Sequence, residues 1–169
     1  MPPASFDAAL RLHQDRVFAF ALHLVGDGDE AADLAQTAFV RLWERGAEVA
    51  EAAQRTWLLR TVRNAALDAF RRNRFVGAAP PDGFDALEHD APSPCDLAEH
   101  ADLAAHAFAA LDTLDEPFRS LVLLCDVQAL SYAEAADVLD LPLTSVRVYL
   151  HRARARLRAA YFLRTRERA

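Results

Sequence analysis

Hydrophobic residues recur every three or four positions along most of the chain, which is the spacing of one face of an α-helix. In the first half this spacing predicts helices over residues 5–25, 29–45 and 53–72. Gly26 directly follows the first of these and is typical of a helix end. The chain has only 5 glycines and few runs of β-branched residues, so it has little material for a sheet. The pattern predicts an all-α fold.

The middle of the chain has a different composition. Residues 76–94 contain four prolines, two glycines and four acids, and show no helical period. Such a composition predicts an acidic flexible linker. We therefore expect two small helical domains, at residues 1–75 and 95–169, joined by this linker.

The spacing of a helix resumes after the linker and predicts a helix that ends near Leu111. Asp115, with Pro117 in the first turn, predicts the start of another helix through "FRSLVLLCDVQAL". Ser131 and Glu134 then form an S-x-x-E capping box, which opens a short helix over "SYAEAADVL". The residues "DLP" break this helix before a basic helix begins. Two helices joined by so short a break predict a helix-turn-helix unit.

The basic helix of this unit has an apolar side and a polar side. Its apolar side is expected to pack on the preceding helix and comprises Val146, Leu150, Ala153 and Leu157. We expect the opposite side to face outward, with Ser145, Arg147, Val148, Tyr149, His151, Arg152, Arg154 and Arg156. That side suits the major groove of DNA, where arginine bonds guanine edges and phosphates and apolar atoms touch thymine methyls. An amphipathic helix with a solvated charged side is the alternative.

Charge is divided into blocks along the chain, although the net charge is only -6. Residues 27–51 contain seven acids and two arginines, whereas residues 55–74 contain six arginines and one acid. Residues 141–169 contain eight arginines and one acid. Because mixed charge serves solubility better, this separation indicates different surfaces for different partners.

Several functional classes lack support in the residues. Cys95 and Cys125 lie thirty residues apart, without the neighbours of a metal site or a disulfide framework. No apolar stretch approaches the ~20 residues of a membrane span, and nothing resembles a signal peptide. Paired carboxylates, a nucleophile with a histidine and a phosphate loop are also missing from the pattern. We expect a soluble cytoplasmic protein that is not an enzyme, with no cofactor, metal, small-molecule substrate or membrane insertion.

Three segments carry a resemblance to a known family. They are "GDGDEAADLAQTAFVRLWE", "TWLLRTVRNAALDAFRR" and "ALDTLDEPFRSLVLLCDVQALSYAEAADVLDLPLTSVRVYLHRARARLR". In turn they are similar to the core-binding, promoter-melting and promoter-binding segments of the extracytoplasmic-function (ECF) sigma factors of bacterial RNA polymerase, in the sigma-70 family. No single segment is decisive, but the three in this order, with a linker before the third, are highly specific.

The resemblance implies roles for individual residues. In the first segment Asp33 and Gln36 are expected to contact core RNA polymerase, and Phe39 is either an apolar anchor for that contact or a core residue. The residues expected to hold melted minus-ten DNA are Arg60, Arg63, Asn64, Arg71 and Arg72. Asp68 is expected to orient Arg71 or Arg72, and the loop at 46–56 to receive a flipped base. The residues expected to contact the minus-thirty-five duplex are Ser145, Arg147, Val148, Tyr149, His151, Arg152 and Arg154.

The resemblance also implies a function and partners. It implies a transcription initiation factor that joins core RNA polymerase, recognises duplex promoter DNA, holds a melted single strand, and is bound by an anti-sigma factor. Such a protein is associated with the nucleoid when it is in the holoenzyme. The acidic linker would occupy the polymerase's RNA path as an RNA mimic, so neutralising its acids, Asp82, Asp85, Glu88 and Asp90, should alter abortive initiation.

The chain departs from the family pattern at three places. Thr37 replaces the usual Glu, Gln54 occupies a place that is often apolar, and Val148-Tyr149 replaces a polar residue followed by Arg. The last change has two possible meanings. Either this chain recognises a different promoter sequence, with Val148 touching a thymine methyl, or its DNA binding is weaker. A sigma-like decoy that binds an anti-sigma factor without recognising promoters is therefore an alternative. A dimeric helix-turn-helix regulator is disfavoured because it leaves the first domain unexplained.

Overall fold

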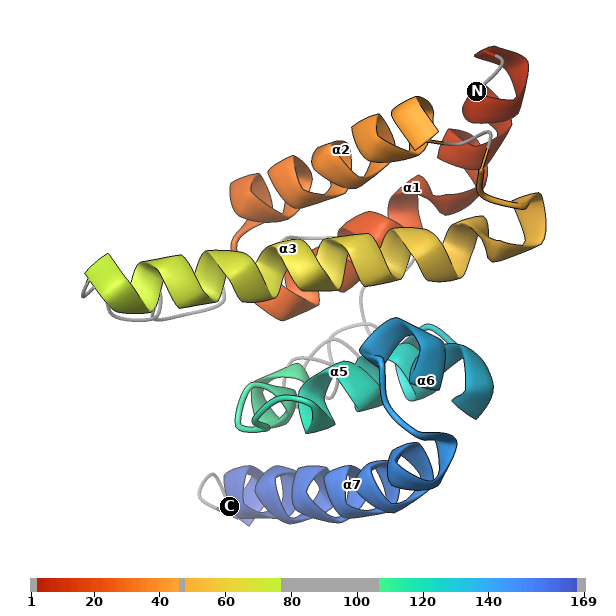
Figure 1. The fold of residues 1–169 in the computed structure, drawn as a ribbon. Coiled ribbons are helices and arrows are strands. Elements are labelled where there is room, and N and C mark those ends of the chain that lie inside the picture. Colours follow the sequence, from red (N-terminus) through yellow and green to blue (C-terminus); the bar gives the residue numbers. More distant parts are fainter. Residues whose placement is uncertain (1–2, 46–47, 77–106, 167–169) are drawn as a thin grey trace, which may run out of the picture.

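The computed structural model describes residues 3–45, 48–76 and 107–166. None of the residues it describes forms a strand, which confirms the all-α prediction. Almost all of the predicted linker, and most of the helix predicted to end near Leu111, lie outside the described residues. The residues that are described form an N-terminal and a C-terminal helical unit (Figure 1).

The N-terminal unit contains α1 (Pro3–Val25), α2 (Gly28–Arg45), the short 3-10 helix η1 (Glu51–Ala53) and α3 (Gln54–Val76). The three predicted helices are therefore confirmed, with ends that differ by a few residues. Gly26 has φ 75° and ends α1, a conformation that glycine adopts without a steric penalty. Asp27 begins α2, because its Oδ1 accepts a hydrogen bond from the Glu30 N–H at 2.8 Å.

The N-terminal core lies where α1, α2 and α3 meet. Its largest fully buried side chains are Val17, Phe20, Leu42, Leu58, Leu59 and Val62. These residues come from one stripe of each helix, as the spacing predicted. The remaining sides of α2 and α3 therefore take no part in this N-terminal core.

The C-terminal unit begins with residues 107–111 in a helix, followed by α5 (Phe118–Val122), which continues directly into a π-helical turn, η2 (Leu123–Val127). The predicted helix start at Asp115 is wrong, because α5 begins at Phe118 with Pro117 as its cap and no side-chain cap bond. Proline disfavours the helical conformation in the residue before it. The helix consequently starts after Pro117 and not before it.

The helix-turn-helix prediction is confirmed in α6 (Tyr132–Leu139) and α7 (Leu143–Arg166). Ser131 Oγ accepts a bond from the Glu134 N–H at 3.2 Å, and the Glu134 carboxylate accepts one from the Ser131 N–H at 2.8 Å. This is the predicted capping box. Asp140 ends α6 in the left-handed conformation, with φ 54°, and Pro142 precedes the first turn of α7.

The two units pack together. In Figure 1, α3 lies on the side of the N-terminal unit that faces the C-terminal unit, and it contacts α6 there. Buried apolar residues of both units form one continuous cluster. This packing places the arginine-rich side of α3 beside the helix-turn-helix unit. Among the helices of the described ranges, none combines the length and apolar character needed to cross a bilayer.

Candidate nucleic-acid and polymerase interfaces

The apolar side of α7 is buried as predicted. Val146, Leu150 and Ala153 are at most 1% exposed, and Leu157 packs partly buried against the same cluster. These residues recur at helical spacing, so one side of α7 is fixed against α5 and α6. The helix is therefore held firmly enough to present its opposite side to a partner.

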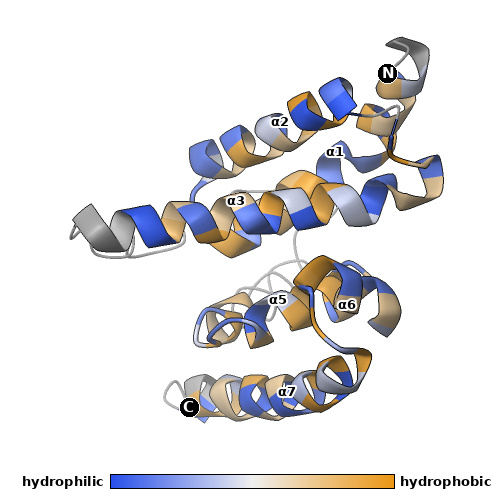
Figure 2. Ribbon diagram, viewed as in Figure 1, coloured by the Kyte–Doolittle hydropathy of each residue, from blue (hydrophilic) through white to orange (hydrophobic). Residues whose placement is uncertain are grey.

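The opposite side of α7 carries cations and one exposed apolar residue. Arg147, His151 and Arg152 are exposed, and Ser145 is half-buried. Val148 lies among them and exposes 48% of its surface. Hydrophilic and hydrophobic residues interleave along α7 in Figure 2, as expected for a helix with one side buried and one solvated. The structure thus brings together most of the residues predicted to meet duplex DNA.

Tyr149 does not face fully outward, contrary to the prediction. It is half-buried, and its ring centroid lies 5.5 Å from that of Phe118. Position 149 lies three residues after Val146 and four before Ala153, which places it at the edge of the buried side. The Arg156 guanidinium lies 4.5 Å from the centre of the same Phe118 ring, a cation–π arrangement.

Arg154 forms an ion pair within the C-terminal unit. Its Nε donates to Asp126 Oδ2 at 3.1 Å and its Nη2 to Asp126 Oδ1 at 2.5 Å. The hydrogen bonds to Asp126 raise the pKa of Arg154. This predicted DNA contact is therefore already engaged by a carboxylate of η2.

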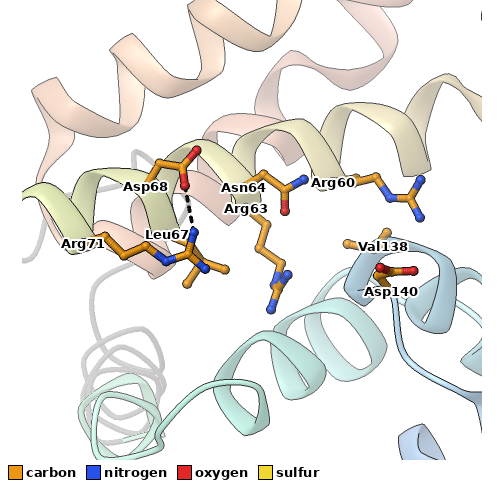
Figure 3. Close-up of a pocket in the computed structure, with 8 residues that line it drawn as sticks. All are labelled: Arg60, Arg63, Asn64, Leu67, Asp68, Arg71, Val138 and Asp140. Carbon is orange, nitrogen blue, oxygen red and sulfur yellow. Dashed lines mark hydrogen bonds and ion pairs between the residues drawn. The ribbon is translucent and has the colours of Figure 1, made fainter.

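The arginines predicted to hold minus-ten DNA lie along α3, but in different surroundings (Figure 3). Arg71 and Arg72 are exposed, and Arg71 Nη1 pairs with Asp68 Oδ1 at 3.1 Å, as predicted for Asp68. Arg63, by contrast, exposes only 12% of its side chain and lies 3.8 Å from the Glu116 carboxylate. Burial lowers the pKa of Arg63, against the opposing effect of Glu116.

The first half of α3 is engaged with the C-terminal unit. Arg60 Nη2 donates to the Asp137 carbonyl, and Arg55 Nη2 donates to the Gln128 carbonyl. Asn64 is exposed and lines a hollow of about 640 Å³ between α3 and the residues around Asp140. The contact of Arg55 could not be predicted from the sequence, because its partner lies 73 residues away along the chain.

The outer side of α2 forms a second hollow. The residues that line it are Asp33, Gln36, Thr37, Val40, Arg41 and Glu44. Asp33 and Gln36 are exposed as predicted. Phe39 is only 6% exposed and its ring meets that of Phe6 edge-on at 6.5 Å, so it is a core residue in this structure. The apolar surface in the hollow comes instead from Val40, which is 49% exposed and which was not predicted from the sequence.

Within the described ranges, no three His, Cys, Asp or Glu side chains are grouped closely enough to hold a metal ion. The surfaces that stand out are polar, charged and shallow. They suit contacts with macromolecules more than binding of a small molecule.

Two family models match this chain. Residues 9–76 match sigma-70 region 2, and residues 108–157 match sigma-70 region 4. These ranges contain α2 and α3 in the first case and α6 and most of α7 in the second. The two matches assign the N-terminal and C-terminal units to regions 2 and 4 of the RNA polymerase sigma factors of the sigma-70 family.

Similar proteins narrow the group. The ECF RNA polymerase sigma factor SigE of Mycolicibacterium smegmatis is 36% identical over 91% of this chain, which spans 60% of that protein's length. The RNA polymerase sigma-E factor of Streptomyces avermitilis is 32% identical over 90% of this chain and 83% of its own length. The chain belongs to the extracytoplasmic-function group of the sigma-70 family.

Solved structures share the fold. One is the sigma factor RpoE of Bartonella quintana, solved with the anti-sigma factor NepR. The match covers 92% of this chain and 96% of the RpoE chain, with a TM-score of 0.74 and a sequence identity of 24%. Another is CnrH, solved with the cytosolic domain of CnrY. The match covers 94% of this chain and 88% of the CnrH chain, with a TM-score of 0.68 and a sequence identity of 23%. At these identities the likeness concerns the fold.

Proposed function

We propose that this chain is a transcription initiation factor that binds core RNA polymerase and directs it to specific promoters. The observation that carries the proposal is the helix-turn-helix unit, in which one side of α7 is buried and the other exposes Arg147, His151 and Arg152. A rigid helix with an exposed cationic side fits the major groove, where it recognises the minus-thirty-five duplex. Val148 adds an apolar contact within that side.

The N-terminal unit supplies the other two contacts of this function. The outer side of α2, with Asp33, Gln36 and the exposed Val40, is the surface for core polymerase. The arginine side of α3, with Asn64, binds melted minus-ten DNA. Guanidinium groups suit this task because they pair with phosphates and stack on unpaired bases. In this proposal residues 1–75 and 95–169 are the two functional domains and residues 76–94 join them.

The activity is binding and promoter opening, and the chain is not an enzyme. We infer a cytoplasmic location, with nucleoid association in the holoenzyme, because core polymerase and promoters are found there. RpoE of Bartonella quintana was solved with the anti-sigma factor NepR, and CnrH with the cytosolic domain of CnrY. An anti-sigma factor is by analogy a further partner of this chain.

A sigma-like decoy is the second candidate, and the exposed Val148 is the observation that favours it. Valine at this place removes a polar DNA contact, and Tyr149 is turned partly toward Phe118. A decoy would bind polymerase or an anti-sigma factor but form no open complex.

The deciding experiment mixes the purified chain with core polymerase and measures binding and promoter opening separately. Co-elution on a sizing column reports binding, and permanganate reactivity of unpaired thymines reports opening. A sigma factor gives both. Co-elution without reactive thymines on any promoter fragment of the source genome would favour the decoy.

A further inference from the structure

Three side chains stack at the edge of the DNA-facing side of α7. The ring of Phe118, at the start of α5, contacts α7 at two points. Its centroid lies 5.5 Å from that of Tyr149, at an interplanar angle of 54°, and 4.5 Å from the guanidinium carbon of Arg156. Helices α5 and α7 lie side by side in Figure 1. A single ring therefore joins two positions on the helix that we propose to enter the major groove.

These two positions lie on one strip of α7. Arg156 follows Tyr149 by seven residues, which is close to two helical turns. Tyr149 is half-buried and marks the edge of the buried side, whereas Arg156 is exposed. An α-helix with its side chains is about 10–12 Å across and the major groove is about 12 Å wide, so residues at the edge of the helix meet the DNA strands. The place of Arg156 thus suits a backbone phosphate better than a base.

Phe118 is a fixed support for this arginine. Its ring is half-buried and, like that of Tyr149, packs against the hydrophobic core. Ser120 and Leu121, which follow in the same helix, are fully buried. The core therefore holds the ring in place, and the ring in turn limits where the exposed guanidinium can lie.

Arg156 differs in this respect from Arg154. The Nε and Nη2 groups of Arg154 both donate to Asp126. Among the residues that the structure describes, no carboxylate forms an ion pair with Arg156. Arginine can stack on an aromatic ring with its face while its N–H groups, which lie in the guanidinium plane, bond a phosphate. Holding a long side chain in one place before binding also lowers the entropy lost on binding.

We propose that Arg156 bonds a DNA phosphate beside the minus-thirty-five element, and that Phe118, supported by Tyr149, is the positioning residue that orients this arginine before DNA binds. The inference rests on the proposed function and adds two residues to its duplex surface. Because a phosphate contact carries no base information, the stack sets how α7 sits in the groove and not which sequence it recognises. Tyr149, which departs from the family pattern, thereby has a role within the stack.

The test is a double-mutant cycle between Phe118 and Arg156 in the holoenzyme formed with core polymerase. Phe118→Leu keeps an apolar side chain but removes the ring, and Arg156→Ala removes the guanidinium. Phe118→Tyr keeps a ring and is the rescue variant. The matched control is Arg158→Ala, which also removes one exposed cation from α7. Two residues turn a helix by about 200°, so Arg158 points away from the strip that contains Arg156.

Fluorescence anisotropy measures binding of a dye-labelled duplex that carries the minus-thirty-five element of a promoter opened by the holoenzyme, over a range of salt concentrations. Arg156→Ala should weaken binding about tenfold, as expected for one charged hydrogen bond. It should also make the slope of log affinity against log salt shallower by about 0.9, the value for one phosphate. Phe118→Leu should weaken binding about twofold to fivefold, the size of an exposed cation–π contact.

We expect Phe118→Leu to weaken binding in the wild-type and Arg158→Ala chains but not in the Arg156→Ala chain, and Phe118→Tyr to bind like the wild type. Equal losses in all three backgrounds would overturn the positioning role, since a ring that only stabilises the fold acts in each of them. Thermal unfolding of each free chain confirms that it is folded.

The salt slope of Arg156→Ala tests the phosphate contact separately, because this variant changes only an exposed side chain. A slope equal to that of the wild type would overturn the contact and leave the proposed function intact. A wild-type holoenzyme that binds no promoter fragment of the source genome would overturn the proposed function, and the inference with it.

Discussion

Arg154 of α7 and Asp126 of η2 form a two-point ion pair that joins α7 to the π-helical turn after α5, with N–O distances of 3.1 and 2.5 Å. Both side chains remain partly exposed, at 42% and 33%. A pair with this exposure contributes at most about 1 kcal/mol to folding. Because both guanidinium nitrogens of the pair are used by the carboxylate, we expect Arg154 to hold the orientation of α7 and not to bond a base.

The first prediction compares Arg154 with its neighbour Arg152, which is exposed. Arg154→Ala should lower the free energy of unfolding by about 0.5–1 kcal/mol and weaken binding to all duplexes alike. Arg152→Ala should leave unfolding unchanged and weaken binding sequence-selectively, by about 1–3 kcal/mol if it bonds a base. Urea unfolding and binding to cognate and scrambled minus-thirty-five duplexes measure the two effects. A uniform, salt-dependent loss with Arg152→Ala would instead make it a phosphate contact.

The second prediction concerns the capping box that opens α6. Ser131→Ala should lower the free energy of unfolding by about 1 kcal/mol, because the hydroxyl that accepts from the Glu134 N–H and donates to the Glu134 carboxylate is lost. Hydrogen bonds from Ser131 lower the pKa of Glu134 from its ordinary value of 4.5. A carboxyl whose pKa is lower in the folded state stabilises the fold above its ordinary pKa, and this stabilisation is lost as pH falls through the folded-state value.

Unfolding measured as a function of pH tests this linkage. Stability of the wild type should fall on acidification below about pH 4.5 more steeply than that of Glu134→Gln, which has no carboxyl to protonate. Ser131→Ala should lie between the two, because it loses the hydroxyl but keeps the backbone N–H that also bonds the Glu134 carboxylate. Identical acid profiles in all three proteins would show that the box contributes nothing to the pH dependence.

The third prediction concerns the reactivity of Cys125. Burial, with a further effect of Asp126, raises the pKa of this thiol to about 11 from 9.0. Since the thiolate is the reactive form, a shift of this size lowers its fraction at pH 8 by roughly 100-fold. Alkylation of Cys125 by iodoacetamide should be slower by that order in the folded chain than in guanidinium. A Cys95→Ser background isolates the reaction, and equal rates in both conditions would contradict the burial.

The fourth prediction assigns Val148 to a thymine methyl. Val148→Ala should weaken binding to the cognate minus-thirty-five duplex by about 1 kcal/mol, the value of one or two buried methyl groups. Replacing the contacted thymine with uracil removes the methyl group of the DNA from the same contact. This change should weaken binding of the wild-type protein by a similar amount. If the contact exists, uracil should have little further effect on Val148→Ala. Additive losses from the protein and DNA changes would argue against a direct contact.

The local features were predictable because they depend on neighbouring residues. The helices follow from apolar spacing, the capping box from Ser131 and Glu134, and the buried side of α7 from Val146 and Leu150. The pairing of Asp68 with Arg71 is likewise local.

Other features depend on which residues the fold brings together. Tyr149 is half-buried because Phe118 lies against it. Arg63 is covered because Glu116 comes from the other unit. Neither contact follows from residue spacing along one helix. The residue types on each surface could therefore be predicted from the sequence, but not which of these side chains are covered by residues from elsewhere in the chain.

Transcription by purified core polymerase on genomic DNA of the source organism, with and without this chain, is the most direct test of the proposed function. Sequencing the 5′ ends of the transcripts maps every start site. We expect the chain to add discrete start sites that share two short upstream sequence blocks, and Arg152→Ala to reduce their use. Start sites identical to those of core polymerase alone, with the folded chain retained by the enzyme, would contradict promoter recognition.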